Sequence, residues 1–282
     1  MTSEFVHLHN HSDYSLLDGA QTVQTLVNTV DDLGMDSVAL TEHGNMFSVI
    51  PYYKSAKSAG IKPIIGCETY VAVGSRFDKK PRSDGGWGNN HLVLLAKDYK
   101  GYQNLMKLVT HGYLEGFYYR PRIDIELLQK YNEGLICLSG CLKGEIPERM
   151  LKDDWNGAKE AALRFSEIFP DRFYLEIQNH GIPDEEQNIK NIKKLSSELD
   201  IPMVCTNDAH YAKHEHWEAH DVHICLGTGK DRNDPNRLRY ATPEFYFKSQ
   251  DQMFELFKDI PGAIENTRKI ADSIEIEIPM GD

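Results

Sequence analysis

The sequence predicts an α/β protein built as a barrel of β/α units. Short apolar runs with strand character recur along the chain, stretches with helical periodicity separate most of them, and metal-binding side chains follow several of the runs. Strands that alternate with helices are typical of parallel β-α-β units. Barrel enzymes carry their chemistry on loops at the carboxyl ends of the strands, whereas an open sheet normally recruits fewer strands to its crevice. We therefore expect a barrel with one functional site at its mouth.

The expected strands are short, and most of the expected helices show an apolar face. The strands are predicted at Phe5–Leu8, Ser37–Leu40, Lys62–Val73, Leu92–Ala96, Leu135–Leu138, Phe173–Ile177 and Pro202–Cys205. The helices are predicted at residues 22–33, 51–59, 102–110, 156–169, 183–199, 249–257 and 261–273. Polar, glycine-rich or charged composition predicts irregular loops at 78–90 and 230–239. The chain ends in an alternating, strand-like tail, so we expect a single domain over residues 1–282 of a longer polypeptide, with 250–282 leading onward.

Composition describes an ordinary soluble globular protein. The chain has 282 residues, of which 40% are hydrophobic and 26% charged, and it carries a net charge of −12 with a pI near 5.5. Bulk electrostatics would repel nucleic acid, but bound cations would neutralise several acids, so a phosphate-bearing substrate is not excluded. Five cysteines without a secretory leader indicate a reducing compartment. No apolar stretch approaches the roughly 20 residues that span a bilayer, so we expect a cytoplasmic protein without a membrane partner.

Two pairs of candidate metal ligands follow the first and the last apolar runs. Side chains alternate along an extended segment, so His9 and His11 point the same way and can grip one ion. Asp208 and His210 repeat this spacing. His7 would share the face of the first pair, as a third ligand or as a supporting partner. Imidazole and carboxylate together suit zinc, manganese or iron.

Three single residues after other apolar runs extend this set. Asp18 lies in a Leu-Leu-Asp-Gly turn, where an Asp-Gly pair taken alone is usually a plain turn. His43 precedes Gly44, at which the backbone can bend sharply, and Glu68 ends a buried run, where an unpartnered acid is costly. Glu42 is a candidate ligand, general base or helix-entry acid. Because the candidates are dispersed along the chain, they favour a multi-metal catalytic centre over a small structural zinc site.

The residues alone leave His91 and Cys141 open. His91 begins an apolar run instead of ending one, so it reaches the same mouth only if that strand runs antiparallel. Cys141 is a candidate thiolate ligand, but an inert packed thiol is the commoner case. The histidines between 214 and 223 are expected on a helix or loop surface.

Three further residues are candidate substrate contacts. His180 follows a predicted strand and is placed to touch substrate at the mouth. Arg120 and Arg122 lie beside two tyrosines, and guanidinium groups suit phosphate recognition, although a solvated loop fits them equally well. The chain contains neither of the common phosphate-cradling glycine loops and no nucleophile elbow.

The order of these motifs resembles the polymerase and histidinol phosphatase superfamily. The longer strings Phe5–Gly19, Thr41–Met46, Lys62–Val71 and Asn207–Tyr211 are similar to the N-terminal domains of bacterial DNA polymerase III alpha subunits, and the resemblance runs nearly end to end. It implies a distorted, seven-stranded, TIM-like β/α barrel that holds three divalent metal ions. The nine ligands that it implies are His9, His11, Asp18, His43, Glu68, His91, Cys141, Asp208 and His210. Relatives often have Thr-Asp-His at the position of Thr41, Glu42 and His43, but that acid is outside the nine.

The resemblance also implies a function. A metal-dependent phosphodiesterase with Asp18, Glu68 and Asp208 as catalytic carboxylates would act as a 3′–5′ proofreading exonuclease on the primer end of DNA. The domain would work beside the remaining polymerase domains and the sliding clamp, and would not extend DNA by itself. Two alternatives stay open: a catalytically silent module braced by its metals, and a free-standing phosphatase of small molecules.

Overall fold

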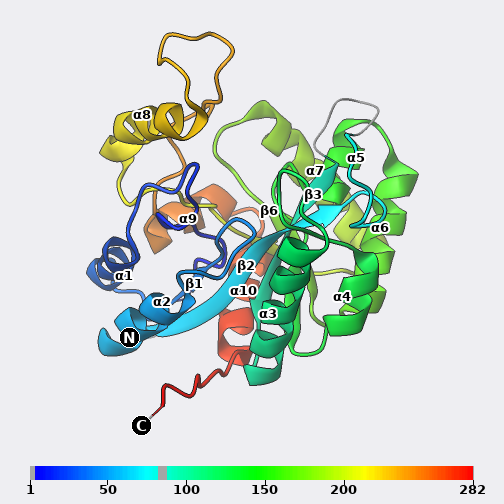
Figure 1. Ribbon diagram of the computed structural model, residues 1–282, viewed down its shortest axis with the longest axis horizontal. Helices are drawn as coiled ribbons and strands as arrows, with labels where there is room; N and C mark the ends of the chain where they lie inside the picture. The colour runs from blue at the N-terminus through cyan, green and yellow to red at the C-terminus, as the bar shows by residue number, and fades with distance from the viewer. Residues whose placement is uncertain (1–3, 82–87, 282) are drawn as a thin grey trace.

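A computed structural model describes residues 4–81 and 88–281. In these ranges seven strands form one curled sheet, a half-barrel with helices around it (Figure 1). The strand order is β1-β2-β3-β5-β6-β7, and β4 pairs with β2 off this path. The strands are β1 Ser37–Leu40, β2 Lys62–Ala72, β3 Asn89–Ala96, β4 Arg122–Ile123, β5 Leu135–Leu138, β6 Phe173–Ile177 and β7 Met203–Cys205. The predicted α/β barrel class is therefore confirmed.

The N-terminal segment lies between the two edge strands of the curled sheet. His7 forms a parallel bridge with Val38 of β1, and Asn10 forms one with Ala209, just past β7. The predicted strand Phe5–Leu8 is thus an extended segment held by isolated bridges instead of a continuous ladder. Its position brings the first histidine pair to the gap between β1 and β7.

Strand β3 runs against both of its neighbours. It pairs antiparallel with β2, where His91 lies opposite Tyr70, and antiparallel with β5. The pairs β1–β2, β5–β6 and β6–β7 are parallel. An antiparallel β3 is the condition under which His91, at the start of its strand, reaches the same end of the sheet as the residues that follow the parallel strands.

Ten α-helices and one 3₁₀-helix are found in the described part of the chain. They are α1 Val23–Asp32, α2 Val49–Ser58, α3 Tyr99–Leu114, α4 Ile125–Tyr131, α5 Glu145–Leu151, α6 Trp155–Ile168, α7 Pro183–Leu199, η1 His214–His216, α8 Trp217–Thr228, α9 Gln250–Phe257 and α10 Pro261–Ser273. Side-chain oxygens cap several of them: Asp98, Asp124 and Asp154 each accept from a backbone N–H three residues later. Helix α7 instead begins with proline followed by three acids, which suit the positive end of a helix dipole.

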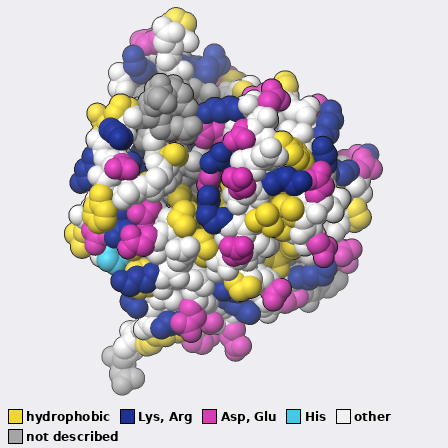
Figure 2. All heavy atoms as spheres, turned by 90° about the vertical axis from the view of Figure 1, so that its right-hand side faces the viewer, with side chains coloured by type: hydrophobic (Ala, Val, Ile, Leu, Met, Phe, Trp, Pro, Cys, Tyr) yellow, Lys and Arg dark blue, Asp and Glu magenta, His cyan; other side chains and the backbone are white. Residues whose placement is uncertain are grey.

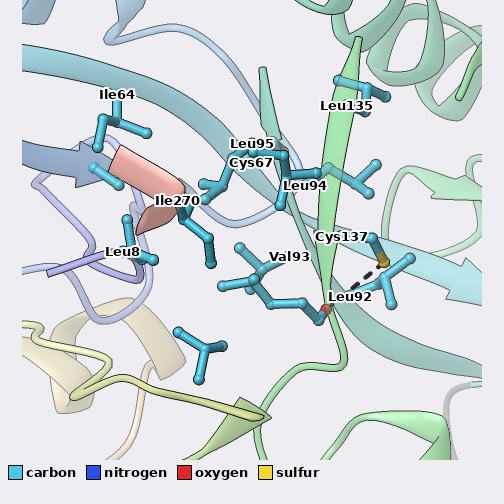
Figure 3. Packing of buried hydrophobic residues seen from close by; sticks show 14 of the residues in the cluster. Leu8, Ile64, Cys67, Leu92, Val93, Leu94, Leu95, Leu135, Cys137 and Ile270 are labelled. Atoms are coloured by element: carbon cyan, nitrogen blue, oxygen red, sulfur yellow. Dashed lines mark hydrogen bonds between the residues drawn. The ribbon is translucent and has the colours of Figure 1, made fainter. Parts of the chain in front are cut away.

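The apolar core surrounds β3. Leu92, Val93, Leu94 and Leu95 are all buried, because helices cover one face of the sheet and the inside of the curl covers the other. Figure 3 shows these side chains among residues of β2 and β5, with Ile270 of α10 close by. This packing fixes the strand ends that carry the candidate ligands.

The tail does not form the predicted strand, yet its alternation has a structural use. Ile274, Ile276 and Ile278 are buried, while Glu277 between the last two accepts a hydrogen bond from Tyr53 of α2. The predicted loop at 78–90 falls partly outside the described residues, at 82–87, and the segment 230–239 is irregular as expected. No helix within the described ranges has the length and hydrophobicity to cross a bilayer.

Candidate metal centre

The nine implied ligands come together at one end of the curled sheet. Among the described residues, three groups have potential ligand atoms within 4.8 Å of one another: His11 with His43 and His210, His9 with His11 and Asp208, and Glu68 with His91 and Cys141. The ninth residue, Asp18, joins them because its Oδ1 lies 3.1 Å from Nε2 of His43. The dispersed segments therefore meet in one place.

Glu68 of β2 connects the groups. Its Oε1 lies 2.5 Å from Nδ1 of His91 and 3.9 Å from the sulfur of Cys141. Its Oε2 contacts Nδ1 of His43 and lies 3.8 Å from Nε2 of His11. Glu68 would therefore be among the residues that hold a bound cation, because each of its oxygens lies beside other candidate ligands.

Asp208 also contacts several of the candidate ligands. Its Oδ1 lies 3.0 Å from Nε2 of His11 and 3.4 Å from Nε2 of His9. The backbone of Asp208 has a φ of 47°, in the left-handed region that few side chains adopt. Strained backbone of this kind is often found where a functional site fixes the direction of a side chain.

Four of the candidate ligand atoms are buried without a hydrogen bond to any described residue: Nε2 of His9, Nε2 of His11, Oδ1 of Asp18 and Oδ1 of Asp208. Leaving a buried polar atom unpaired costs about 1–3 kcal/mol. Three of them lie together, since Nε2 of His9 and Nε2 of His11 are 3.4 and 3.0 Å from Oδ1 of Asp208, and Oδ1 of Asp18 lies beside Nε2 of His43. Their donor types, with the nearby thiol, are those that bind zinc, manganese or iron. The residues present therefore fit a metal centre.

The charges inside the cluster also fit cations. Burial alone would raise the pKa of Glu68, but His91 and His43 hold it well below its usual range. Burial, reinforced by Glu68 and Asp208, raises the pKa of the Cys141 thiol well above its usual range, so this side chain becomes a thiolate ligand only when a cation binds. In the protein alone, histidine protons balance the acids, which is the role that a divalent ion would take over.

His9 and His11 show opposite protonation within this field. Burial opposes a charge on His9, but Asp208, Glu176 and Glu68 together raise its pKa to about 10. For His11, burial and the neighbouring histidines lower the pKa to about 3.

Glu176 of β6 is a functional residue that the sequence analysis missed. Its Oε1 accepts a hydrogen bond from Nδ1 of His9 at 2.7 Å and from Thr206 and Gln178, while its Oε2 accepts from the backbone N–H of Gly140. Because Nδ1 of His9 is engaged, its Nε2 is directed toward Asp208. A carboxylate behind a ligating histidine normally orients the ring and raises its basicity. The available signal was an acid inside an apolar strand.

Glu42 supports the ligands from outside the cluster. It accepts hydrogen bonds from the hydroxyl groups of Ser12, Ser15 and Ser48. The Ser15 hydroxyl also lies 3.1 Å from Nδ1 of His11, which leaves the Nε2 of that ring for a metal. Glu42 was considered as a ligand, a general base or a helix-entry acid. Its three serine hydrogen bonds indicate instead that it holds the segments around the cluster in place.

Two residues from the C-terminal third line the cluster near Asp18. The Tyr240 hydroxyl lies 2.9 Å from Nε2 of His210 and donates to Oδ2 of Asp18 at 3.3 Å. His220 of α8 donates through Nε2 to the backbone carbonyl of Asp18 at 2.8 Å. The expectation that His220 lies on a surface was wrong, because its ring is buried between Tyr211 and Tyr240.

His7 does not join the ligands. Its Nε2 donates to the backbone carbonyl of Lys248 at 2.8 Å, and its ring packs between Phe5 and Phe247. Its place beside β1 is therefore structural.

The candidate substrate contacts divide into two kinds. His180 is buried, with Nδ1 bonded to Glu185 and Nε2 donating to the carbonyl of Asn207. Arg122 is also buried and donates to three backbone carbonyl groups, those of residues 76, 78 and 116. Both side chains are committed to the fold, so we leave them out of the proposed substrate site. Arg120 is exposed.

Fold and site together define an α/β protein with a candidate multi-metal centre. The PHP domain model matches residues 7–180, and the chain belongs to the PHP domain family. Over 273 residues it is 50% identical to the DNA polymerase III subunit alpha of Borreliella burgdorferi, covering 97% of this chain and 24% of that protein. The corresponding subunit of Thermus aquaticus is 42% identical over 284 residues, covering 99% of this chain and 23% of that protein. The chain thus spans about a quarter of the length of these relatives.

Two solved structures are similar to this chain, both at low sequence identity. The histidinol phosphate phosphatase of Lactococcus lactis, solved with zinc, L-histidinol and phosphate, is 15% identical with a TM-score of 0.42, covering 82% of this chain and 95% of that one. A proposed metal-dependent phosphoesterase of Bifidobacterium adolescentis is 12% identical with a TM-score of 0.47, covering 90% of this chain and 95% of that one.

Proposed function

We propose that the chain is the N-terminal PHP domain of a replicative DNA polymerase III alpha subunit, and that its metal centre is a phosphodiesterase with 3′–5′ proofreading exonuclease activity. The similarity to alpha subunits over almost the whole chain supports the first part. The observation that carries the second part is the convergence of nine donor side chains with four orphaned ligand atoms at their centre. We propose all nine as ligands of up to three divalent ions, zinc, manganese or iron.

Each part of the site has a task in such a reaction. Bound divalent ions would supply a hydroxide near neutral pH and stabilise charge on the phosphoryl oxygens. Glu68 and Asp208 would help to hold the ions, since each carboxylate lies among histidines of more than one segment. Asp18 would complete the site beside Tyr240, whose hydroxyl holds Oδ2 of the carboxylate in place. Glu176 would fix the orientation of His9 throughout.

The test uses the 282-residue chain loaded with manganese or zinc and primers with matched or mismatched 3′ ends. We expect nucleotide release from the mismatched end, reduced at least about 100-fold in Asp18→Asn, because a positioned catalytic group typically contributes that much. Asp13→Asn is the matched control, because it is the same substitution at an exposed residue in a turn five positions earlier in the chain. If the wild type releases nothing, or Asp18→Asn releases nucleotides at the wild-type rate, the exonuclease assignment is wrong.

Two further experiments separate the two alternative functions. If the metals only brace a polymerase, the double variant His9→Ala and Asp208→Ala in the full-length subunit lowers thermal stability and polymerase activity without changing any nuclease signal. Turnover of histidinol phosphate or a similar monoester would instead favour a small-molecule phosphatase. As part of an alpha subunit, the domain would meet the DNA primer end, the other polymerase domains and the sliding clamp in the cytoplasm.

A further inference from the structure

Three aromatic side chains form a strip on the surface beside the metal centre. Phe47, Phe117 and Tyr113 are 60%, 48% and 37% exposed. The ring centroids of Phe47 and Tyr113 are 6.1 Å apart, and those of Tyr113 and Phe117 are 6.2 Å apart. Single exposed apolar residues need no explanation, but a contiguous patch of this kind marks an interaction site. We call these three residues the aromatic strip.

The aromatic strip is attached to the candidate ligands through the backbone. Phe47 follows His43 by four residues, in the turn that leads into α2. The Asn45 side chain accepts a hydrogen bond from the Phe47 N–H at 3.1 Å and donates to the His43 carbonyl at 3.2 Å. One end of the strip is therefore held in a fixed position relative to the metal centre.

The positively charged side chain of Arg120 also lies near the metal centre. The exposed Arg120 has its guanidinium 5.6 Å from the ring centroid of Tyr70, and the Tyr70 ring meets the His91 ring edge-on at 5.2 Å. Gly44, in the loop after β1, lies close to Tyr70 of β2 and to Pro121 in the loop after α3. A Cβ at Gly44 would lie 2.8 Å from Tyr70 and 2.9 Å from Pro121. The loop after β1 and the loop after α3 thus pack together closely. The first carries Phe47, the second carries Phe117 and Arg120, and Tyr113 lies in the last turn of α3.

We propose that the aromatic strip and Arg120 bind the unpaired 3′-terminal nucleotides of single-stranded nucleic acid on their way to the metal centre. This inference rests on the proposed phosphodiesterase function. Stacking of bases on aromatic rings is the usual way in which proteins hold single strands without reading sequence, and an arginine beside the rings suits the phosphate.

The spacing of the rings selects against a duplex. Neighbouring bases of a duplex are about 3.4 Å apart along each strand. The rings of the aromatic strip are 6.1 and 6.2 Å apart, so successive bases reach successive rings only when they are no longer stacked on each other. A frayed, mismatched primer end meets this condition, whereas a paired end does not. The net charge of −12 opposes binding through phosphates alone, which makes stacking the larger contribution.

The test measures binding without hydrolysis. Fluorescence anisotropy of a 5′-labelled oligothymidylate is followed in the presence of a chelator, with the wild-type chain and with Phe47→Ala, Tyr113→Ala and Phe117→Ala. Each substitution is expected to weaken binding at least about five-fold, the lower end of what one stacked base contributes. Tyr99→Ala is the matched control, because Tyr99 is 40% exposed at the opposite end of the same helix, α3. Its affinity should stay at the wild-type value.

Two further measurements complete the test. In Arg120→Gln, the slope of log affinity against log salt concentration is expected to become shallower by about 0.7, the value for one phosphate contact of a single strand. A blunt duplex of the same length is expected to bind more weakly than the single strand. Absence of binding, equal binding by the strip variants and Tyr99→Ala, equal affinity for duplex, or an unchanged salt slope would each overturn the proposal. If binding depends on the aromatic strip but no nucleotide is released, the exonuclease proposal is refuted and the proposal of a binding surface is retained.

Discussion

Replacing Glu176 by glutamine separates the support of a ligand from the ligand itself. The carboxylate accepts hydrogen bonds on both oxygens, from His9, Thr206 and Gln178 at Oε1 and from the Gly140 N–H at Oε2. A glutamine amide offers one acceptor and one donor, so at least one buried donor loses its partner, at a cost of about 1–3 kcal/mol. The free energy of unfolding of the chelated protein should fall by that amount.

The larger interest lies in metal binding. Loss of a carboxylate behind a ligating histidine typically lowers metal affinity about 10–100-fold. We therefore expect Glu176→Gln to release metal at a correspondingly lower concentration of a competing chelator, followed by a metal-sensitive dye. Unfolding in urea, measured on the chelated protein, reports the stability cost separately.

Glu185→Gln supplies the matched control for this experiment. Glu185 is also buried and also accepts from a histidine, but that histidine, His180, lies outside the proposed ligand set. The control should lose stability and keep the wild-type metal affinity. If the two variants lose metal affinity equally, the effect is general destabilisation and the assigned role of Glu176 is incorrect.

Three other outcomes are expected. Gly34→Ala and Gly44→Ala both place a side chain at positive φ, 67° and 63°, but only the Cβ at position 44 collides with Tyr70. Gly44→Ala should therefore lower the free energy of unfolding in urea by about 1–3 kcal/mol more than Gly34→Ala. Equal losses would argue against close packing around Gly44. Asp221→Asn breaks a two-bond pair with Arg237 and should lower the free energy of unfolding. Because Arg237 lowers the pKa of Asp221, this contribution is complete above about pH 4 and is lost as the pH falls through the lower folded value, so wild type and variant should converge in acid; a constant difference would contradict the assignment. Chelation should lower the thermal midpoint, by the equivalent of about 2.7 kcal/mol for a metal present at a hundred times its Kd, and added zinc or manganese should restore it; an unchanged midpoint would contradict a metal centre.

Much of the fold could be predicted from local pattern. Helix α7 begins and ends at the predicted residues because Pro183 and the acids after it signal a start, and α10 likewise begins at its proline. The buried strands β1, β5 and β6 also have their predicted bounds, since each is a short and mostly apolar run.

The elements that were missed lack such a pattern. Helices α4 and α5 have seven residues each, too few for a clear apolar face. Helix α8 carries apolar residues without a preferred side, so its sequence looked like surface. Strand β4 has two residues and exists because Arg122 and Ile123 pair with β2, a contact between distant segments that local sequence does not encode.

Several candidate ligands could be predicted from the sequence, but the residues that hold them in place could not. His9 with His11 and Asp208 with His210 were found because alternating ligands after apolar runs form a recognisable pattern. His91 could not be decided from spacing, since its position depends on the direction of β3. Tyr240 was missed because it lies in an irregular segment, and its hydroxyl reaches Asp18 only through the path of the chain after α8.

The buried acids of the site fall into two layers, and this division bears on which of them do chemistry. Glu42 accepts hydrogen bonds from hydroxyl groups, and Glu176 accepts them from Thr206, Gln178, the Gly140 N–H and Nδ1 of His9, so each outer acid has fixed donors in the fold. Asp18, Glu68 and Asp208 face mainly the histidines of the cluster, and oxygens of two of them have no hydrogen bond to any described residue. The fixed donors hold the outer acids whether or not metal is bound, whereas the inner acids face mainly the cluster and need a positive charge there to remain buried. We therefore expect the inner three to be the carboxylates that respond to metal and substrate, which is why the catalytic role is proposed for them and a supporting role for the outer two.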